Sequence, residues 1–447
     1  MRFFDRQFSL AILLLTLPLL FLPKINLISL DSGETAGLRI DDLVLFCVSI
    51  LFMWAHLHSH QRLYKVEGWI LTITAFSLFS FLINRILFSA NMLYLEAKIF
   101  YSFRLLEYFL FFYIGALATQ FFQDRAIVRA FFMWNLLVMI LQKFNFIGGM
   151  TSAGYDGDVS SRVPGLASFP SEMGLLLNLF FCYFVFDDQI QSRFINLFRS
   201  PFTRYLLHKL YLYGLFCLFG ILIVFTGNRI SIVALFVCFI FRIKQDLSLR
   251  SIGSYISMMI LIPIVALAVG FAITKTMGVY DRSSKLLSTK NLELFTLVWD
   301  NVDIKESPNG NETFGAKNYD MSWFLRIHKW LFMIKSYLNS PECYLQGLGP
   351  GYAGAALDGG LLRIVTEYGL IGTFLFWKFF GYLYRLNAQT KWMIIAFMIN
   401  MIFFDAYLAY KTMSFLLFTC GYIFERKLET HLTQHGVYLD RSQSSRG

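Results

Sequence analysis

Long apolar runs recur along the chain and alternate with short polar segments. Most runs are about 15 to 20 residues long, the length of a helix that crosses the roughly 30 Å hydrocarbon core of a membrane. The pattern predicts about twelve membrane-spanning helices, at residues 8–22, 42–57, 68–84, 105–122, 127–148, 173–187, 210–226, 230–241, 255–273, 364–384, 392–408 and 411–424. No small-residue cleavage site follows the first run, so we expect an uncleaved first span rather than a signal peptide.

The composition supports this interpretation. Hydrophobic residues make up 57% of the 447 residues and charged residues only 15%, which leaves too little polar surface for a soluble globule. We therefore expect an all-α, polytopic integral membrane protein, organised as a single membrane domain over residues 1–447.

The net charge of +10 could indicate a nucleic-acid-binding protein, but the distribution of the basic residues argues against it. They concentrate in alternate loops, at Arg2, Arg6, Arg62, Lys65, Arg125, Arg129, Arg193, Arg199, Arg204, Lys209, Arg242, Lys244, Arg250, Arg385, Lys391, Arg426 and Lys427. With about twelve spans, all these loops lie on one side, and the positive-inside rule places that side and both termini in the cytoplasm. We expect no nucleic-acid partner.

The largest non-cytoplasmic segment is the loop at residues 274–363, between the ninth and tenth spans. Residues 300–320 are rich in Asn, Gly and Asp and indicate turns. Residues 322–338 repeat apolar side chains at spacings of three and four, which predicts an amphipathic helix that lies on the membrane or caps a cavity. The glycines at 347–354 lack the lysine of a nucleotide-binding loop, so we expect a compact turn there and no ATP site.

The cysteines indicate neither a disulfide nor a metal site. Five of the six lie in apolar runs, and Cys343 is the one cysteine in an outer loop. The sequence contains no CxxC motif and no histidine-rich spacing. We therefore expect no cofactor and no bound metal.

Four short motifs adjoin the predicted spans. They are RVPGLASFPSEMG at 162–174, TGNRISIVAL at 226–235, MSWFLRIHKW at 321–330 and DGGLLRIVTEYGLIG at 358–372. In sequence, order and position, these motifs resemble those of the O-antigen polymerase and O-antigen ligase superfamily. The resemblance implies a membrane glycosyltransferase similar to the GT-C class, with a large periplasmic loop. It also implies that polyprenyl-diphosphate-linked sugars are used at the periplasmic face of the bacterial inner membrane.

One position within the last motif distinguishes the two activities of this superfamily. Ligases typically have a histidine eleven residues before the glycine that corresponds to Gly369, whereas this chain has Asp358 there. The difference favours a polymerase, which joins lipid-linked repeat units into O-antigen, capsular or exopolysaccharide with inversion and without a metal. Its donor and acceptor are both glycans on polyprenyl diphosphate, and its implied partners are a flippase and a chain-length regulator.

Two other functions remain as alternatives. The first is a ligase that transfers glycan to lipid A core or to protein. The second is a polysaccharide flippase or secondary transporter, which would show internal repeats and broken helices. The sequence reveals neither feature.

Arginines are the candidate ligands of the lipid diphosphate. Breaking a sugar–diphosphate bond develops negative charge on the leaving group, and a guanidinium binds phosphate oxygens bidentately. Arg229 and Arg326 match the phosphate-binding positions of the superfamily, and Arg162, in a turn rich in proline and glycine, is a candidate third. From spacing alone, Arg162 and Arg229 also fit arginines that anchor the chain at the lipid headgroups.

Asp358 is the candidate catalytic residue, because the attacking hydroxyl needs a proton acceptor and a carboxylate near the arginines could serve. Asp358 would also be a good N-cap of the tenth span. Arg363 and Glu367 are secondary candidates for substrate binding, on a different helical face from Asp358 if all three are helical. Asp405, a carboxylate at the outer end of a span, is a candidate to orient an arginine or to bind sugar.

Overall fold

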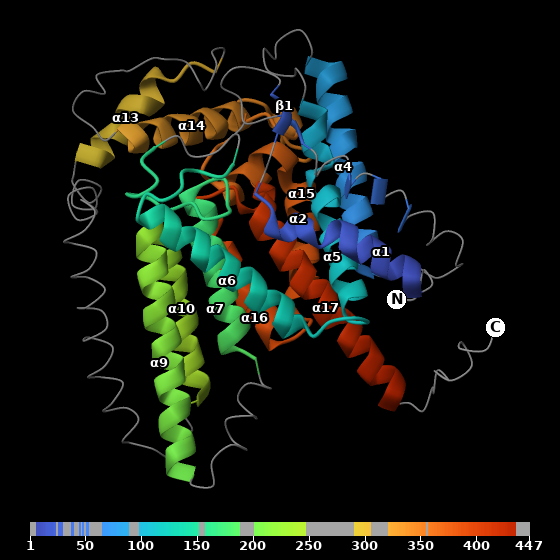
Figure 1. Cartoon of the computed structure of the whole chain (residues 1–447). Helices are drawn as coiled ribbons and strands as arrows, with labels where there is room; N and C mark the ends of the chain where they lie inside the picture. The colour runs from blue at the N-terminus through green and yellow to red at the C-terminus, as the bar shows by residue number, and fades with distance from the viewer. Residues whose placement is uncertain are drawn as a thin grey trace.

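We describe the protein from a computed structural model (Figure 1). It describes residues 6–23, 26–29, 37–39, 44–45, 47–48, 51–52, 65–88, 98–151, 157–187, 201–246, 290–304, 321–354 and 356–434. The run expected to span the membrane at 255–273 lies outside the described residues, as do most of the run at 42–57 and most of the turn-rich stretch at 300–320.

Helices account for nearly all of the regular structure, which confirms the helical fold class. The α-helices are α1 (Arg6–Thr16), α2 (Pro18–Phe21), α4 (Lys65–Phe88), α5 (Arg104–Ala118), α6 (Asp124–Lys143), α7 (Pro170–Val185), α9 (Pro201–Thr226), α10 (Arg229–Asp246), α13 (Lys290–Asn301), α14 (Met321–Leu338), α15 (Gly360–Tyr384), α16 (Ala388–Asn400) and α17 (Tyr410–Gln434). Short 3-10 turns occur at Lys98–Ser102, Pro341–Cys343 and Ala406–Leu408. The sequence analysis did not anticipate the antiparallel pair of β1 (Asn26–Ser29) and β2 (Gly37–Arg39).

Several described helices have the length and composition of membrane spans. Three segments are long and apolar enough to cross a bilayer, namely Lys65–Ile86, Ile99–Ala118 and Arg125–Lys143. Shorter apolar helices lie at Arg6–Phe21, Pro170–Val185 and Leu210–Thr226. These helices are suited to a membrane by length and composition, while insertion into a membrane and the count of about twelve spans stay predictions.

A close backbone contact joins α5 and α17, which are far apart in the sequence. A Cβ atom added to Gly115 would overlap the carbonyl of Phe418, and one added to Gly421 would overlap the carbonyl of Phe112. Small residues at facing positions let two membrane helices approach this closely. Buried aromatic rings fill much of the surrounding core, in keeping with the 50 phenylalanines of the chain.

The amphipathic helix expected at residues 322–338 is confirmed as α14. Its buried side chains, among them Phe324, Ile327 and Phe332, pack against α13 and against the loop that follows α14, in a core separate from that of the main bundle. Figure 1 shows α13 and α14 lying across one end of the bundle. The helix α14 therefore covers the loop that leads to the last motif.

The helix α15 is interrupted at Gly369, whose φ of 62° and ψ of −166° are not helical. The sequence analysis revealed no broken helix and so missed this interruption. The glycine-rich segment at 344–349 fills the interruption with main-chain hydrogen bonds, from Leu348 N–H to the Thr366 carbonyl (2.8 Å) and from Leu370 N–H to the Tyr344 carbonyl (3.0 Å). Because this backbone passes against Gly369, a side chain at this position would collide with it.

Candidate functional site

The four motifs gather at one end of the molecule, the upper end in Figure 1. The loop before α7, the turn between α9 and α10, the helix α14 and the start of α15 all lie there. A main-chain hydrogen bond from Val163 to Phe225 (2.9 Å) ties the first motif to the end of α9. The side chain of Arg326 ties the third motif to the fourth.

Arg162 lies beside the turn that carries Arg229. Gly227 and Asn228 connect α9 to α10, and Arg229 is the first residue of α10. A Cβ atom on Gly227 would lie 3.3 Å from Nε of Arg162, so the Arg162 side chain packs against this turn. Both arginines are partly exposed. The structure thus places Arg162, a predicted substrate-binding arginine, against the turn that precedes Arg229, another one.

Buried amide side chains hold these two loops in place. The Gln142 amide accepts a hydrogen bond from the Gly165 N–H (2.8 Å) and donates one to the Gly165 carbonyl (3.1 Å). Asn228 donates to the Ser171 carbonyl (3.0 Å) and to the Ser231 hydroxyl (2.7 Å). The sequence analysis missed these amides because Gln142 and Asn228 form hydrogen bonds with residues that are distant in the sequence.

Arg326 and Asp358 form an ion pair, with 2.8 Å between Nε and Oδ2. Their side chains are 36% and 35% exposed, so a ligand can reach the pair. The alternative role of Asp358 as the N-cap of α15 is wrong. The N-cap residue is Gly359, with no side-chain hydrogen bond, and Asp358 precedes the helix with a left-handed φ of 56°.

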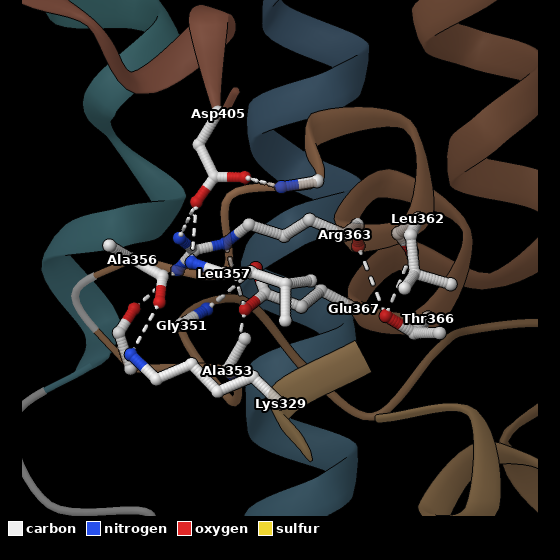
Figure 2. Close-up of polar contacts among 12 residues, drawn as sticks. Lys329, Gly351, Ala353, Ala356, Leu357, Leu362, Arg363, Thr366, Glu367 and Asp405 are labelled. Atoms are coloured by element: carbon white, nitrogen blue, oxygen red, sulfur yellow. Dashed lines mark hydrogen bonds and ion pairs between the residues drawn. The ribbon is translucent and has the colours of Figure 1, made fainter. Parts of the chain in front are cut away.

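Asp405 organises the loop around Asp358 (Figure 2). Its carboxylate accepts hydrogen bonds from the N–H groups of Leu357 (2.8 Å) and Gly359 (3.1 Å). It also pairs with Nη1 of Arg363 at 3.0 Å. Asp405 therefore orients an arginine, one of the two roles expected from its sequence position, and it also fixes the main chain that carries Asp358.

Glu367 holds an earlier stretch of the same loop in a similar way. Its carboxylate accepts hydrogen bonds from the N–H groups of Gly351 (3.0 Å) and Ala353 (2.9 Å) and lies 3.1 Å from Nε of Arg363. The guanidinium of Arg363 also donates to the Gly354 carbonyl at 2.6 Å. Arg363 and Glu367 are fully buried, and Figure 2 shows their polar contacts. The contacts seen for both residues are within the protein, and their contact with a substrate stays a prediction.

Lys329 is a residue of this site that the sequence analysis missed. Its Nζ donates a hydrogen bond to the Ala356 carbonyl at 2.9 Å, beside the Asp358 loop. Burial lowers the pKa of the Lys329 ammonium below its usual value, although the nearby carboxylates of Asp358 and Asp405 act in the opposite direction. Its position three residues after Arg326, on the same face of α14, was the available signal.

The arrangement places two cations and a carboxylate at a half-exposed position, on a loop that buried ion pairs hold from the inside. Guanidinium and ammonium groups suit an anionic ligand, and a carboxylate suits proton acceptance. No protein-family model matches the chain, and no curated protein is significantly similar to it.

Proposed function

We propose that this protein polymerises polyprenyl-diphosphate-linked oligosaccharide repeat units into a surface polysaccharide, such as O-antigen, capsule or exopolysaccharide. The reaction is an inverting, metal-independent glycosyl transfer on the periplasmic face of the bacterial inner membrane. One observation carries this proposal: the half-exposed ion pair of Arg326 and Asp358 lies at the end of the molecule where Arg162 packs against the turn before Arg229.

In the proposed reaction, the oxygen of the acceptor hydroxyl attacks the anomeric carbon of the donor sugar, and Asp358 accepts the hydroxyl proton. The bond between that carbon and the phosphate oxygen breaks, and the polyprenyl diphosphate leaves with the bonding electrons. Attack from the side opposite to the leaving group inverts the configuration. Arg326 binds the phosphate oxygens and stabilises their negative charge as it develops.

A polymerase holds two lipid-linked glycans at once, and the candidate arginines lie at two places that match this requirement. Arg326, beside Asp358, binds the diphosphate of the donor. Arg162 and Arg229, which both lie at the α9–α10 turn, bind the diphosphate of the acceptor. A flippase and a chain-length regulator are the expected partners in the same membrane.

The alternatives differ from this proposal in specific ways. A ligase would share the arginines, but the motif position typical of the ligase histidine holds Asp358. A transporter would share the broken helix, but the interruption at Gly369 is filled by the backbone of residues 344–349. Polymerisation is the function that gives a role to Asp358 as well as to the arginines.

The glycan that accumulates after deletion of the gene tests the proposal. Loss of a polymerase leaves single repeat units on their normal carrier, which run as a short band on a gel, and the wild-type gene should restore long chains. Loss of a ligase instead leaves long chains stranded on polyprenyl diphosphate. Stranded long chains would therefore replace the polymerase with the ligase.

A further inference from the structure

We infer that Arg326 and Lys329 together bind one diphosphate group, and that the carboxylate of Asp358 occupies the place of this anion on Arg326 until the ligand arrives. The identity of the ligand as a lipid diphosphate rests on the proposed function. The existence of a two-cation anion site rests on geometry and charge alone.

The two cations lie on one face of α14 and reach the same stretch of loop. Residues three apart on a helix are neighbours on its surface. Arg326 contacts Asp358 at 2.8 Å, and Lys329 contacts the Ala356 carbonyl, two residues earlier, at 2.9 Å. Figure 2 shows the Lys329 side chain extended toward that carbonyl. A ligand at this loop can therefore contact both side chains.

Among the described residues, the positive charge of Arg326 and Lys329 exceeds the negative charge in contact with them. Asp358 offsets one of the two cations, and the carboxylate of Asp405 is engaged by Arg363 and by two main-chain N–H groups. Within the described ranges, Nζ of Lys329 makes one hydrogen bond, to a neutral carbonyl, although an ammonium carries three donors. An anion at this position would engage the remaining donors.

The solvation of the Lys329 ammonium also favours an anion at this position. Partial burial removes water from the Lys329 ammonium, and no described residue places an anion in hydrogen-bond contact with it, so its pKa is lowered. A diphosphate carries oxygens on two phosphorus atoms, so it can engage a guanidinium and an ammonium that are one helical turn apart.

Binding of the diphosphate displaces the Asp358 carboxylate from Arg326, and this displacement affects catalysis. The diphosphate and the Asp358 carboxylate are both anions and compete for Arg326, so binding of the diphosphate releases the carboxylate. The released carboxylate can then accept the proton of the acceptor hydroxyl. The base thus becomes accessible only when the donor is in place.

Binding of inorganic pyrophosphate to the full-length chain in neutral detergent, measured by isothermal titration calorimetry, tests this site. Lys329→Gln should weaken binding about tenfold, because it removes one charge-assisted contact. Asp358→Asn should tighten binding several-fold, because it removes the competing anion. Lys335→Gln is the matched control and should leave the affinity unchanged, since Lys335 lies on the same helix but donates to the carbonyls of Trp299 and Val302.

Three results would each overturn the site: no binding of pyrophosphate to the wild type, equal affinity of Lys329→Gln and wild type, or weaker binding by Asp358→Asn. Should Lys329→Gln fail to fold, judged by gel filtration and circular dichroism, Lys329→Met keeps the apolar stem and takes its place. Bound pyrophosphate should be displaced by a short-chain polyprenyl diphosphate. Equal displacement by phosphatidylglycerol would instead assign the site to lipid headgroups and reject the diphosphate.

These measurements do not depend on polymer formation. If gene deletion leaves stranded long chains while the variants bind pyrophosphate as expected, the polymerase is refuted and the anion site stands. If deletion leaves single repeat units while Lys329→Gln binds like the wild type, the polymerase stands and the anion site is refuted.

Discussion

The carboxylate of Asp405 holds the main chain on both sides of Asp358. It accepts hydrogen bonds from the residue before Asp358, Leu357, and from the residue after it, Gly359. Asp358 has a left-handed φ of 56°, a conformation that costs a non-glycine residue on the order of 1 kcal/mol and persists only where the surroundings enforce it. Asp405 is therefore a positioning residue for Asp358.

The first prediction concerns this positioning. Asp405→Asn should lower kcat about 10- to 100-fold with little change in KM for the donor, because a carboxamide cannot hold both N–H groups and Arg363, and a small misplacement of Asp358 is enough to slow the reaction. Purified protein and a lipid-linked repeat unit provide the assay. Glu367→Gln is the comparison, since Glu367 is equally involved with Arg363 but holds Gly351 and Ala353. If it lowers kcat as much as Asp405→Asn does, at matched thermal stability, the positioning role is rejected.

Replacement of Asp358 by Asn separates catalysis from structure. Asparagine tolerates the left-handed conformation and is nearly the same size, and a half-exposed ion pair contributes only about 0–1 kcal/mol. The melting temperature in detergent should therefore stay close to that of the wild type, while polymer formation should fall below detection. Normal polymer from Asp358→Asn would show that this residue is not the proton acceptor.

The arginines should not tolerate replacement by lysine. Arg326→Lys and Arg229→Lys keep the positive charge but lose the planar fork that binds phosphate bidentately. We expect each to reduce polymer at least about tenfold at equal protein level, measured by gel analysis of the glycan and by immunoblot. Full activity of both variants would mean that these side chains serve only as interfacial anchors.

Two glycines of α15 should respond in opposite ways to alanine. Gly369→Ala should destabilise the protein by about 3 kcal/mol or more, because the position needs a glycine-only conformation and lies against backbone. Gly381→Ala, on the same helix with open space around it, should be neutral or stabilising by up to about 1 kcal/mol. Thermal unfolding in detergent measures both. Equal melting temperatures would show that the interruption of α15 is not required.

Membrane orientation can be tested with cysteines introduced at Asn309 and Gln245 and a membrane-impermeant maleimide on intact cells. The positive-inside rule predicts that Asn309→Cys is labelled and Gln245→Cys is not. The native Cys343 should stay silent near neutral pH, because burial raises the pKa of its thiol to about 11 and the reactive thiolate forms only as the pH approaches that value. Equal labelling of the two introduced cysteines would overturn the topology and the periplasmic placement of the site.

The sequence by itself determined where most helices lie, because apolar runs and three- to four-residue spacings are local properties of the chain. The helix expected at 322–338 begins one residue earlier in the structure, at Met321. The same reasoning missed the interruption of α15, because it depends on backbone contacts with residues 344–349 rather than on anything next to Gly369. It also offered a helix cap as an alternative role for Asp358, because Asp before a helix is a good local solution whenever no distant arginine competes for the carboxylate.

The tertiary structure alone decided which charged residues of the last motif are buried in ion pairs and which one is accessible to a ligand. Arg363 and Glu367 follow Asp358 closely in sequence, yet they are buried and paired, whereas Asp358 meets Arg326 on a separate helix. Asp405, which lies 42 residues beyond Arg363, completes the buried pair and fixes the loop. A buried charge needs partners from whichever elements pack against it, and packing between distant elements is not encoded in the spacing of neighbouring residues. For the same reason the role of Lys329 depends on the packing of α14 against the loop that carries Asp358, where Lys329 donates to the Ala356 carbonyl.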